Sequence, residues 1–287
     1  MLLQMFGGDW TEEKLRRVEK YLKAYNVALK NQPFTREYID AFAGTGYREV
    51  KQSDSKAGLL LPELVEEDCE YFVDGSARIA LKVKPPFHKF TFIERKLAKY
   101  EELRQLKGLH PDREIVTLRG DANEHIQALC RSPWDYRRAV LFLDPFGMQV
   151  TWETIQAVAS TKAIDMWLLF PLGVAVSRLL KKDGDIEESL RGSLDVLFGE
   201  PSWFDAFYKT ETLTDLFGQP QKSVYKVDFR SMERYFIDRL RSIFPGVAGN
   251  PLQLRNSRNV PLYLLCFAAG NAKGAPIAVE IAQNVLK

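Results

Sequence analysis

Residues 38–49 read YIDAFAGTGYRE, a short apolar run that contains an acid and continues into two glycines. An apolar run of this length that ends at glycines is typical of a buried parallel strand. Asp40 lies at the end of that strand, and Gly44 and Gly46 lie in the turn that follows. Because glycine has no Cβ, the backbone can pass close to a ligand there, while the carboxylate accepts hydrogen bonds from an amine or a hydroxyl. The stretch therefore predicts a ligand-binding turn in an open α/β sheet.

The rest of the chain alternates between strand-like and helix-like patterns. After a strand at 37–42, further strands are predicted at 89–93, 114–118, 138–143 and 164–170, and helices at 10–31, 76–84, 97–106, 124–130, 152–160 and 231–244. Two late apolar runs, 252–255 and 261–268, are separated by a turn and predict a final hairpin, antiparallel at one end of the sheet. Strands separated by helices form βαβ units, so we expect a doubly wound, mostly parallel α/β sheet.

Two stretches interrupt this alternation and divide the chain. Residues 1–34 form an N-terminal helical arm, and the sheet core takes 35–173 and 229–287. Within the core, 48–74 is a mixed, partly acidic insertion that is a candidate lid over the ligand turn. Residues 174–228 are a helical insertion, with helices expected over 181–197 and 203–217, and a candidate substrate or partner subdomain.

The composition limits the class of protein. Forty Lys and Arg against 38 Asp and Glu leave a formal charge of +2, so any polyanion site must be a local patch. The cysteines and histidines lack the spacing of metal ligands or of a disulfide framework, and we expect no metal: Cys69, Cys130, Cys266, His88, His110 and His125. Neither a secretory leader nor a membrane span is recognisable, which predicts a cytoplasmic protein.

Three further acids follow three further strands. Glu94 ends the run FIE, Asp121 follows in GDA, and Asp144 follows in LDPFG. Because the carboxyl ends of parallel strands meet at one edge, the four acids are expected to share that edge. Each also has a structural interpretation: Asp40 and Glu94 as strand-end caps, Asp121 as a helix N-cap, and Asp144 as part of a turn.

The glycine turn departs from the two phosphate-binding patterns. It has Phe42 where G-x-G-x-x-G has its first glycine, and it lacks the G-K-[ST] end of a phosphate loop. A nucleoside ligand without phosphates fits this turn better than a dinucleotide does. An NAD-dependent oxidoreductase is accordingly the least favoured of the functions we consider.

Together, DAFAGTG, FIE, GDA and LDPFG resemble motifs I to IV of the class I S-adenosylmethionine-dependent methyltransferases, across residues 35–172. DAFAGTG has the D-x-F-x-G-x-G form of the amino-group methyltransferases. LDPFG is similar to their D-P-P-Y motif and to the D-P-F-G of tRNA guanine-N2 dimethyltransferases. With Gly75-Ser76 and the late PLYLLCFA, the set also resembles the three-Cys-motif partner proteins, a bacterial family. The resemblance implies a Rossmann-like methyltransferase fold.

The same resemblance implies roles for individual residues. S-adenosyl-L-methionine would be the cofactor, with its methionine part against Asp40, Phe42, Ala43, Gly44 and Gly46, its ribose on Glu94, and its adenine between Asp121 and Ala122. Asp144 and Pro145 would accept hydrogen bonds from the target amine, and Phe146 would stack on its base. D-P-F-G has one proline and places glycine where D-P-P-Y has its aromatic residue, which displaces Phe146 from the family position.

Two functions follow from this resemblance. The first is a methyltransferase that acts on an exocyclic amine of a nucleic-acid base, in RNA or DNA. The alternative is a binding protein of the same fold that does not catalyse transfer, or does so only with a partner such as a three-Cys-motif protein. The altered D-P-F-G and the lack of a basic stripe favour this alternative.

Overall fold

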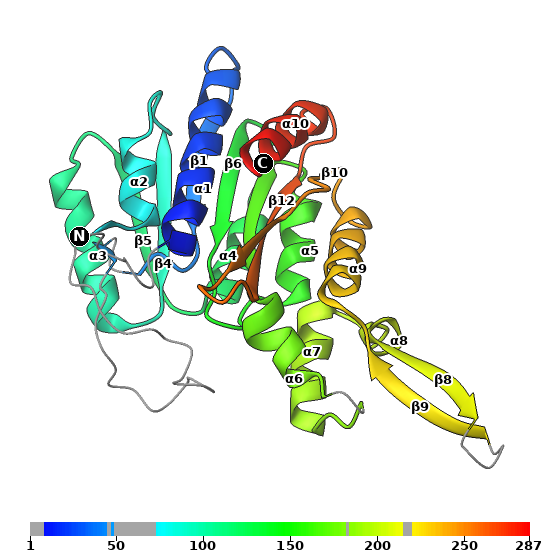
Figure 1. The fold of residues 1–287 in the computed structure, drawn as a ribbon. Helices are drawn as coiled ribbons and strands as arrows, with labels where there is room; N and C mark the ends of the chain where they lie inside the picture. Colours follow the sequence, from blue (N-terminus) through cyan, green and yellow to red (C-terminus); the bar gives the residue numbers. More distant parts are fainter. Residues whose placement is uncertain (1–8, 45–46, 49–72, 182–183, 215–219) are drawn as a thin grey trace, which may run out of the picture.

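The computed structural model describes residues 9–44, 47–48, 73–181, 184–214 and 220–287. Its centre is an eight-stranded sheet in the order β10-β12-β7-β6-β1-β4-β5, with β11 also paired to β12 (Figure 1). Five strands are parallel to one another: β1 (Thr35–Asp40), β4 (Lys89–Glu94), β5 (Glu114–Arg119), β6 (Arg137–Leu143) and β7 (Ile164–Phe170). The doubly wound, mostly parallel sheet expected from the sequence is confirmed.

The strand order reverses beside β1. The chain runs from β1 to β4 and β5 on one side, and then returns to β6 and β7 on the other. Next to β7 lies β12 (Pro261–Ala269), which is antiparallel and pairs with β11 (Leu252–Arg255) and with β10 (Gly246–Val247). This confirms the expected final hairpin. In open α/β sheets ligands bind where the order reverses, here between the carboxyl ends of β1 and β6.

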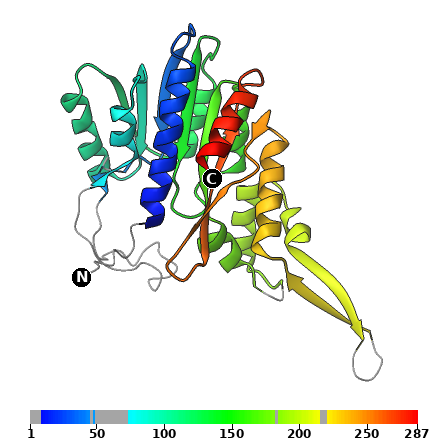
Figure 2. The same ribbon diagram turned by 45° about the horizontal axis from the view of Figure 1, so that its top comes forward.

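Helices cover both faces of the sheet, as a buried parallel sheet requires (Figures 1 and 2). One face carries α1 (Asp9–Ala28), α2 (Ser76–Lys82), α3 (Leu97–Leu109) and α10 (Ala275–Val285). The other carries α4 (Ala122–Cys130), α5 (Trp152–Ser160), α7 (Glu188–Phe198) and α9 (Phe229–Arg241). Successive strand residues alternate between the two cores: Tyr38 packs under α1, whereas Ile39 packs on the opposite face.

The segment after β7 is only partly helical. A short π-helix, η2 (Leu172–Val176), and α6 (Ser177–Leu179) precede α7, and α8 (Trp203–Phe207) follows it. The helix expected over 203–217 is wrong beyond Phe207. There the chain forms an antiparallel ribbon of β8 (Tyr208–Thr214) and β9 (Pro220–Lys226), which projects from the body (Figures 1 and 2). The threonines of TETLT favour a strand over a helix, because branching at Cβ restricts the side chain in a helix.

The domain division remains a prediction. Most of the insertion at 48–74 lies outside the described residues, and its ends pair as β2 (Tyr47–Arg48) and β3 (Val73–Asp74). Leu194, Phe198 and Trp203 of the second insertion pack into the same core cluster as the sheet. Among the described helices, none has the length and apolar character needed to cross a bilayer.

Candidate functional site

Two acids meet at the point where the strand order reverses. Asp40 is the last residue of β1 and pairs in register with Phe142 of β6, two residues before Asp144. Asp40 is fully buried. Burial raises the pKa of its carboxyl to about 7, and the nearby charge of Asp144 adds to the rise. The sheet therefore brings two carboxyl groups into electrostatic contact at the edge where ligands bind in this fold.

Three donors reach the Asp40 carboxylate, and they favour its ionised form. The Phe42 N–H donates to Oδ1 at 3.3 Å and the Tyr38 hydroxyl donates to Oδ2 at 3.4 Å. The Ser76 hydroxyl, at the start of α2, also donates to this carboxylate. Ser76 follows the Gly75 of the sequence resemblance. The bonds from Phe42 and Tyr38 are near the long limit for hydrogen bonds.

The glycine turn lies directly after Asp40. The Ala43 N–H donates to the Ile93 carbonyl at 3.1 Å, which ties the turn to β4. Gly44 has φ of +62°, and a Cβ built on it would meet no heavy atom of the described residues within 4 Å. Ala43 is buried and Phe42 is half-buried, so neither faces this space freely. The turn thus leaves open space at Gly44 among the described residues, while Gly46 lies outside them.

The next two strand ends carry Glu94 and Asp121. The half-buried Glu94 accepts the Lys96 N–H at 2.7 Å through Oε1. Asp121 is the N-cap of α4, where its Oδ1 accepts the N–H groups of Asn123 at 2.9 Å and Glu124 at 3.4 Å. The capping role weighed for Asp121 is therefore present, and its second oxygen has no partner among the described residues. Ala122 is buried as the first residue of α4.

The loop after β6 presents Phe146 to solvent. Its side chain is 79% exposed, and its N–H donates to the Gln149 side chain at 3.0 Å. Gly147 has φ of +67°, a conformation that glycine adopts without strain. Asn123 holds this loop from α4, because its side chain donates to the Gln149 carbonyl at 2.8 Å. The loops after β5 and β6 are thereby joined at one edge.

The sequence did not predict the partner of Asp144. Lys14 of α1 places its Nζ 2.5 Å from Asp144 Oδ2, and Lys14 is only 3% exposed. The ammonium also lies 5.5 Å from the Trp10 ring centre and 5.9 Å from that of Phe142. A signal was present, because Lys14 precedes Leu15 and lies four residues before Val18, on the apolar face of the helix.

Trp10 and Tyr263 form a second unpredicted contact beside Asp144. Their rings stack with centres 5.0 Å apart and join the start of α1 to β12. Burial raises the pKa of Tyr263 to about 12, and the charge of Asp144 contributes to that rise. The N-terminal helix therefore contributes contacts beside Asp144.

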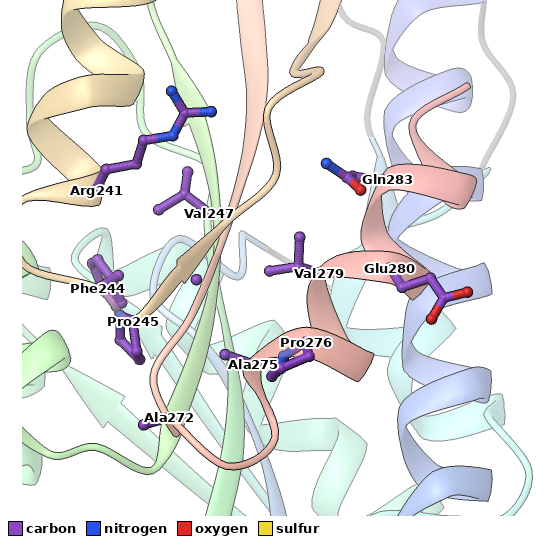
Figure 3. A pocket seen from close by; sticks show the side chains of 11 residues that line it. Arg241, Phe244, Pro245, Val247, Ala272, Ala275, Pro276, Val279, Glu280 and Gln283 are labelled. Carbon is purple, nitrogen blue, oxygen red and sulfur yellow. The ribbon is translucent and has the colours of Figure 1, made fainter.

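The described residues also contain a hollow that belongs to the other edge of the sheet. It lies between the end of α9, β10 and the start of α10, and its lining includes Arg241, Phe244, Val279 and Gln283 (Figure 3). Because Gly246 of β10 pairs with Ala269 at the far end of β12, this hollow is remote from Asp40 and Asp144. No group of His, Cys, Asp and Glu able to hold a metal ion occurs among the residues the structure describes.

No family model matches the chain, and no curated protein matches it. Solved structures with a related arrangement include protein LPL1258 from Legionella pneumophila. It is 13% identical over 83% of this chain and 93% of that chain, with a TM-score of 0.44. Magnesium protoporphyrin IX methyltransferase from Synechocystis PCC 6803, solved with SAM bound, is 12% identical over 77% and 84% of the two chains, with a TM-score of 0.32. The N-terminal domain of EvdMO1, solved with SAH bound, is 11% identical over 88% of this chain and 80% of that chain, with a TM-score of 0.39. Likeness at this level assigns neither a ligand nor a residue role to this chain.

Proposed function

We propose that this protein is an S-adenosylmethionine-dependent methyltransferase that acts on an exocyclic amine of a nucleic-acid base. The observation that carries the proposal is the proximity of buried Asp40 to Asp144 at the strand-order reversal, beside a glycine turn with open space at Gly44. Sequence motifs of the amino-group methyltransferases lie at these same positions. The fold therefore supplies the geometry, and the motifs supply the chemistry.

The residues at the turn fit a cationic nucleoside. Burial and the neighbouring Asp144 disfavour a negative charge on Asp40, and a positive ligand would remove that penalty. Gly44 leaves space that a side chain would fill. Glu94 and Asp121 each keep one carboxylate oxygen without a described partner, so they can accept hydrogen bonds from ribose and adenine. When bound, S-adenosylmethionine supplies an electrophilic methyl group.

The substrate side of the site consists of Asp144, Pro145 and Phe146. An exocyclic amine has its lone pair delocalised into the base, and acceptors for its N–H groups direct that pair toward the methyl carbon. Asp144 Oδ1 and the Pro145 carbonyl are suited to this role. The exposed Phe146 ring offers a surface on which a base can stack, although its loop differs from D-P-P-Y.

Calorimetric titration with S-adenosylmethionine and its demethylated product tests the cofactor assignment. Asp40→Ala should raise the Kd of both ligands at least tenfold. Asp112→Ala, at an aspartate 69% exposed, should bind them as the wild type does. No binding by the wild type would contradict the proposal.

Transfer of radiolabelled methyl groups to unmodified RNA and DNA tests the reaction. We expect Asp144→Ala to retain cofactor affinity and to lose turnover, because the substitution removes a hydrogen-bond acceptor for the substrate amine and none of the residues proposed to contact the cofactor. Normal turnover by this variant would show that the catalytic assignment is wrong.

A second candidate function rests on the ion pair at Asp144. Lys14 already holds one oxygen of this carboxylate. In this second function the chain binds the nucleoside cofactor but does not transfer its methyl group. Transfer would then require a partner protein that rearranges α1. A three-Cys-motif protein is the partner that the sequence resemblance suggests. This alternative predicts a stable complex and no label in any nucleic-acid pool with the isolated chain, so label incorporation by the isolated chain would reject it.

A further inference from the structure

We propose that Lys14 is a positioning residue of this site: it fixes one oxygen of Asp144 and leaves the other to receive the substrate amine. This inference rests on the proposed function, and it assigns to α1 a task that none of the sequence motifs contains. It concerns the geometry of the substrate acceptor rather than the binding of the cofactor.

The ion pair is held in place on the lysine side. Lys14 is 3% exposed, and its ammonium lies 5.5 Å from the ring centre of Trp10 and 5.9 Å from that of Phe142. Trp10 is stacked on Tyr263 of β12. Aromatic faces attract a cation most strongly where water is excluded, so the ammonium has little freedom to move.

The helix that carries Lys14 is also fixed. Its buried residues pack into the core on that face of the sheet: Leu15, Val18, Tyr21, Leu22 and Tyr25. Tyr21 additionally donates a hydrogen bond of 2.8 Å to Asp165 of β7. Displacing α1 would expose this whole face, so the arrangement favours a permanent support over a removable block.

On the aspartate side, only one oxygen is engaged. Lys14 holds Oδ2, and Oδ1 has no partner among the described residues, while the side chain of Asp144 is 26% exposed. An ionised carboxylate accepts through both oxygens. The pair thus presents one oriented acceptor at the carboxyl edge, next to the exposed Phe146.

Lys14 also separates like charges. Asp40 of β1 interacts with Asp144, as do the hydroxyls of Tyr38 on β1 and Tyr263 on β12. Lys14 is the cation that contacts Asp144 among the described residues of the elements packed there. Without it, two carboxyl groups at one strand-order reversal would face each other with no described cation in contact with Asp144.

The first test follows the Asp144 carboxyl directly and needs no substrate. In protein labelled with ¹³C at the aspartate carboxyl carbon, the signal missing from Asp144→Asn identifies Asp144. We expect Lys14→Met to move the chemical shift of this signal at pH 7, because the ammonium that contacts one carboxylate oxygen has been removed. Lys23→Met on the same helix, at a lysine 52% exposed, should leave the signal in place, and Lys14→Arg should keep it near the wild-type position.

The second test measures turnover with the RNA or DNA pool that accepts label. Lys14→Met should lower kcat about 100-fold at pH 7, with less than a threefold change in the S-adenosylmethionine Kd. Circular dichroism and the double variant Lys14→Met/Asp144→Asn distinguish this loss from unfolding. If the double variant is folded and binds the cofactor, the loss belongs to the acceptor.

The outcomes separate the two proposals. Failure of the wild type to transfer label contradicts the methyltransferase assignment, whereas the Asp144 carboxyl signal still decides the role of Lys14. An unchanged signal in Lys14→Met overturns the positioning role. A rise in kcat in that variant also overturns it, because it would show that Lys14 blocks the acceptor.

Discussion

Asp40 and Asp165 are both buried acids of the central sheet, but they lie at opposite edges and have different partners. Asp165, near the start of β7, accepts the Tyr21 hydroxyl at 2.8 Å on one oxygen and the Gly270 N–H at 3.1 Å on the other. Asp40, at the end of β1, accepts the Phe42 N–H and the Tyr38 hydroxyl at longer distances and precedes a glycine turn with open space at Gly44. The first acid has a short partner on each oxygen, whereas the second lies beside another acid, Asp144.

This difference shows how a buried acid can be sorted. Burial raises the pKa of both carboxyls, to about 6 for Asp165 and about 7 for Asp40. A perturbed pKa alone therefore does not identify a binding residue. What distinguishes Asp40 is a second acid nearby and, in the turn that follows it, a glycine at which an added Cβ would meet no described atom.

The largest effect is expected at the closed edge. Asp165→Ala leaves the Tyr21 hydroxyl and the Gly270 N–H buried without partners, which should cost about 4 kcal/mol in the free energy of unfolding. Urea denaturation measures this loss, with Asp112→Ala as the exposed control. Binding of S-adenosylmethionine to the folded fraction should be unchanged, and a loss of affinity would break the distinction between the two edges.

Glycines at the two edges give a smaller and more specific contrast. A Cβ at Gly270 would clash with the Ile164 backbone, so Gly270→Ala should cost about 3 kcal/mol. Gly44→Ala meets no described atom but is strained at its positive φ, and should cost about 1 kcal/mol.

Ligand binding should reverse that order. Gly44→Ala is expected to raise the Kd for S-adenosylmethionine at least tenfold in calorimetric titration, because the alanine methyl group would enter the open space at this turn. Gly270→Ala should bind normally wherever it remains folded. Equal affinities in the two variants would mean that the Gly44 turn does not face the ligand.

Much of the fold was predictable from the sequence because its signals are local. The five parallel strands are apolar runs bounded by turn residues, and their helices have clear periodicity. The ribbon after Phe207 was not predicted, since short segments of mixed polarity fit both periods and tertiary packing decides between them. The strand-end acids were located for the same local reason, because each follows an apolar run.

The contacts that complete the site were not predictable in this way. Lys14 and Asp144 are 130 residues apart, and only the packing of α1 brings them together. The lysine on an apolar helix face was a visible anomaly, but nothing local indicates which acid it meets. Asp121 is a similar case. The same carboxylate caps α4 and is predicted to contact adenine, and an aspartate before a helix is expected for either role, so the sequence does not distinguish them.

The pH dependence of stability provides the finest separation of the two acids. A folded-state pKa above the unfolded value means that the native state binds the proton more tightly, so this stability is present below pH 4 and is lost as pH rises. The loss should end near pH 6 for Asp165 and near pH 7 for Asp40. Between those values Asp40 should contribute at most about 1.4 kcal/mol per pH unit.

Comparison of the wild type with Asp40→Asn isolates this contribution. His88, whose pKa is lowered by burial and by Arg36, loses stability as pH falls and gives an opposite slope that both proteins share. The free energy of unfolding of the wild type minus that of Asp40→Asn should therefore fall from pH 6 to pH 7 and stay level above pH 7. A difference that is flat across this interval would mean that Asp40 is as well satisfied as Asp165. A saturating cationic nucleoside should shift the interval to lower pH in the wild type alone, because its charge favours the ionised carboxylate.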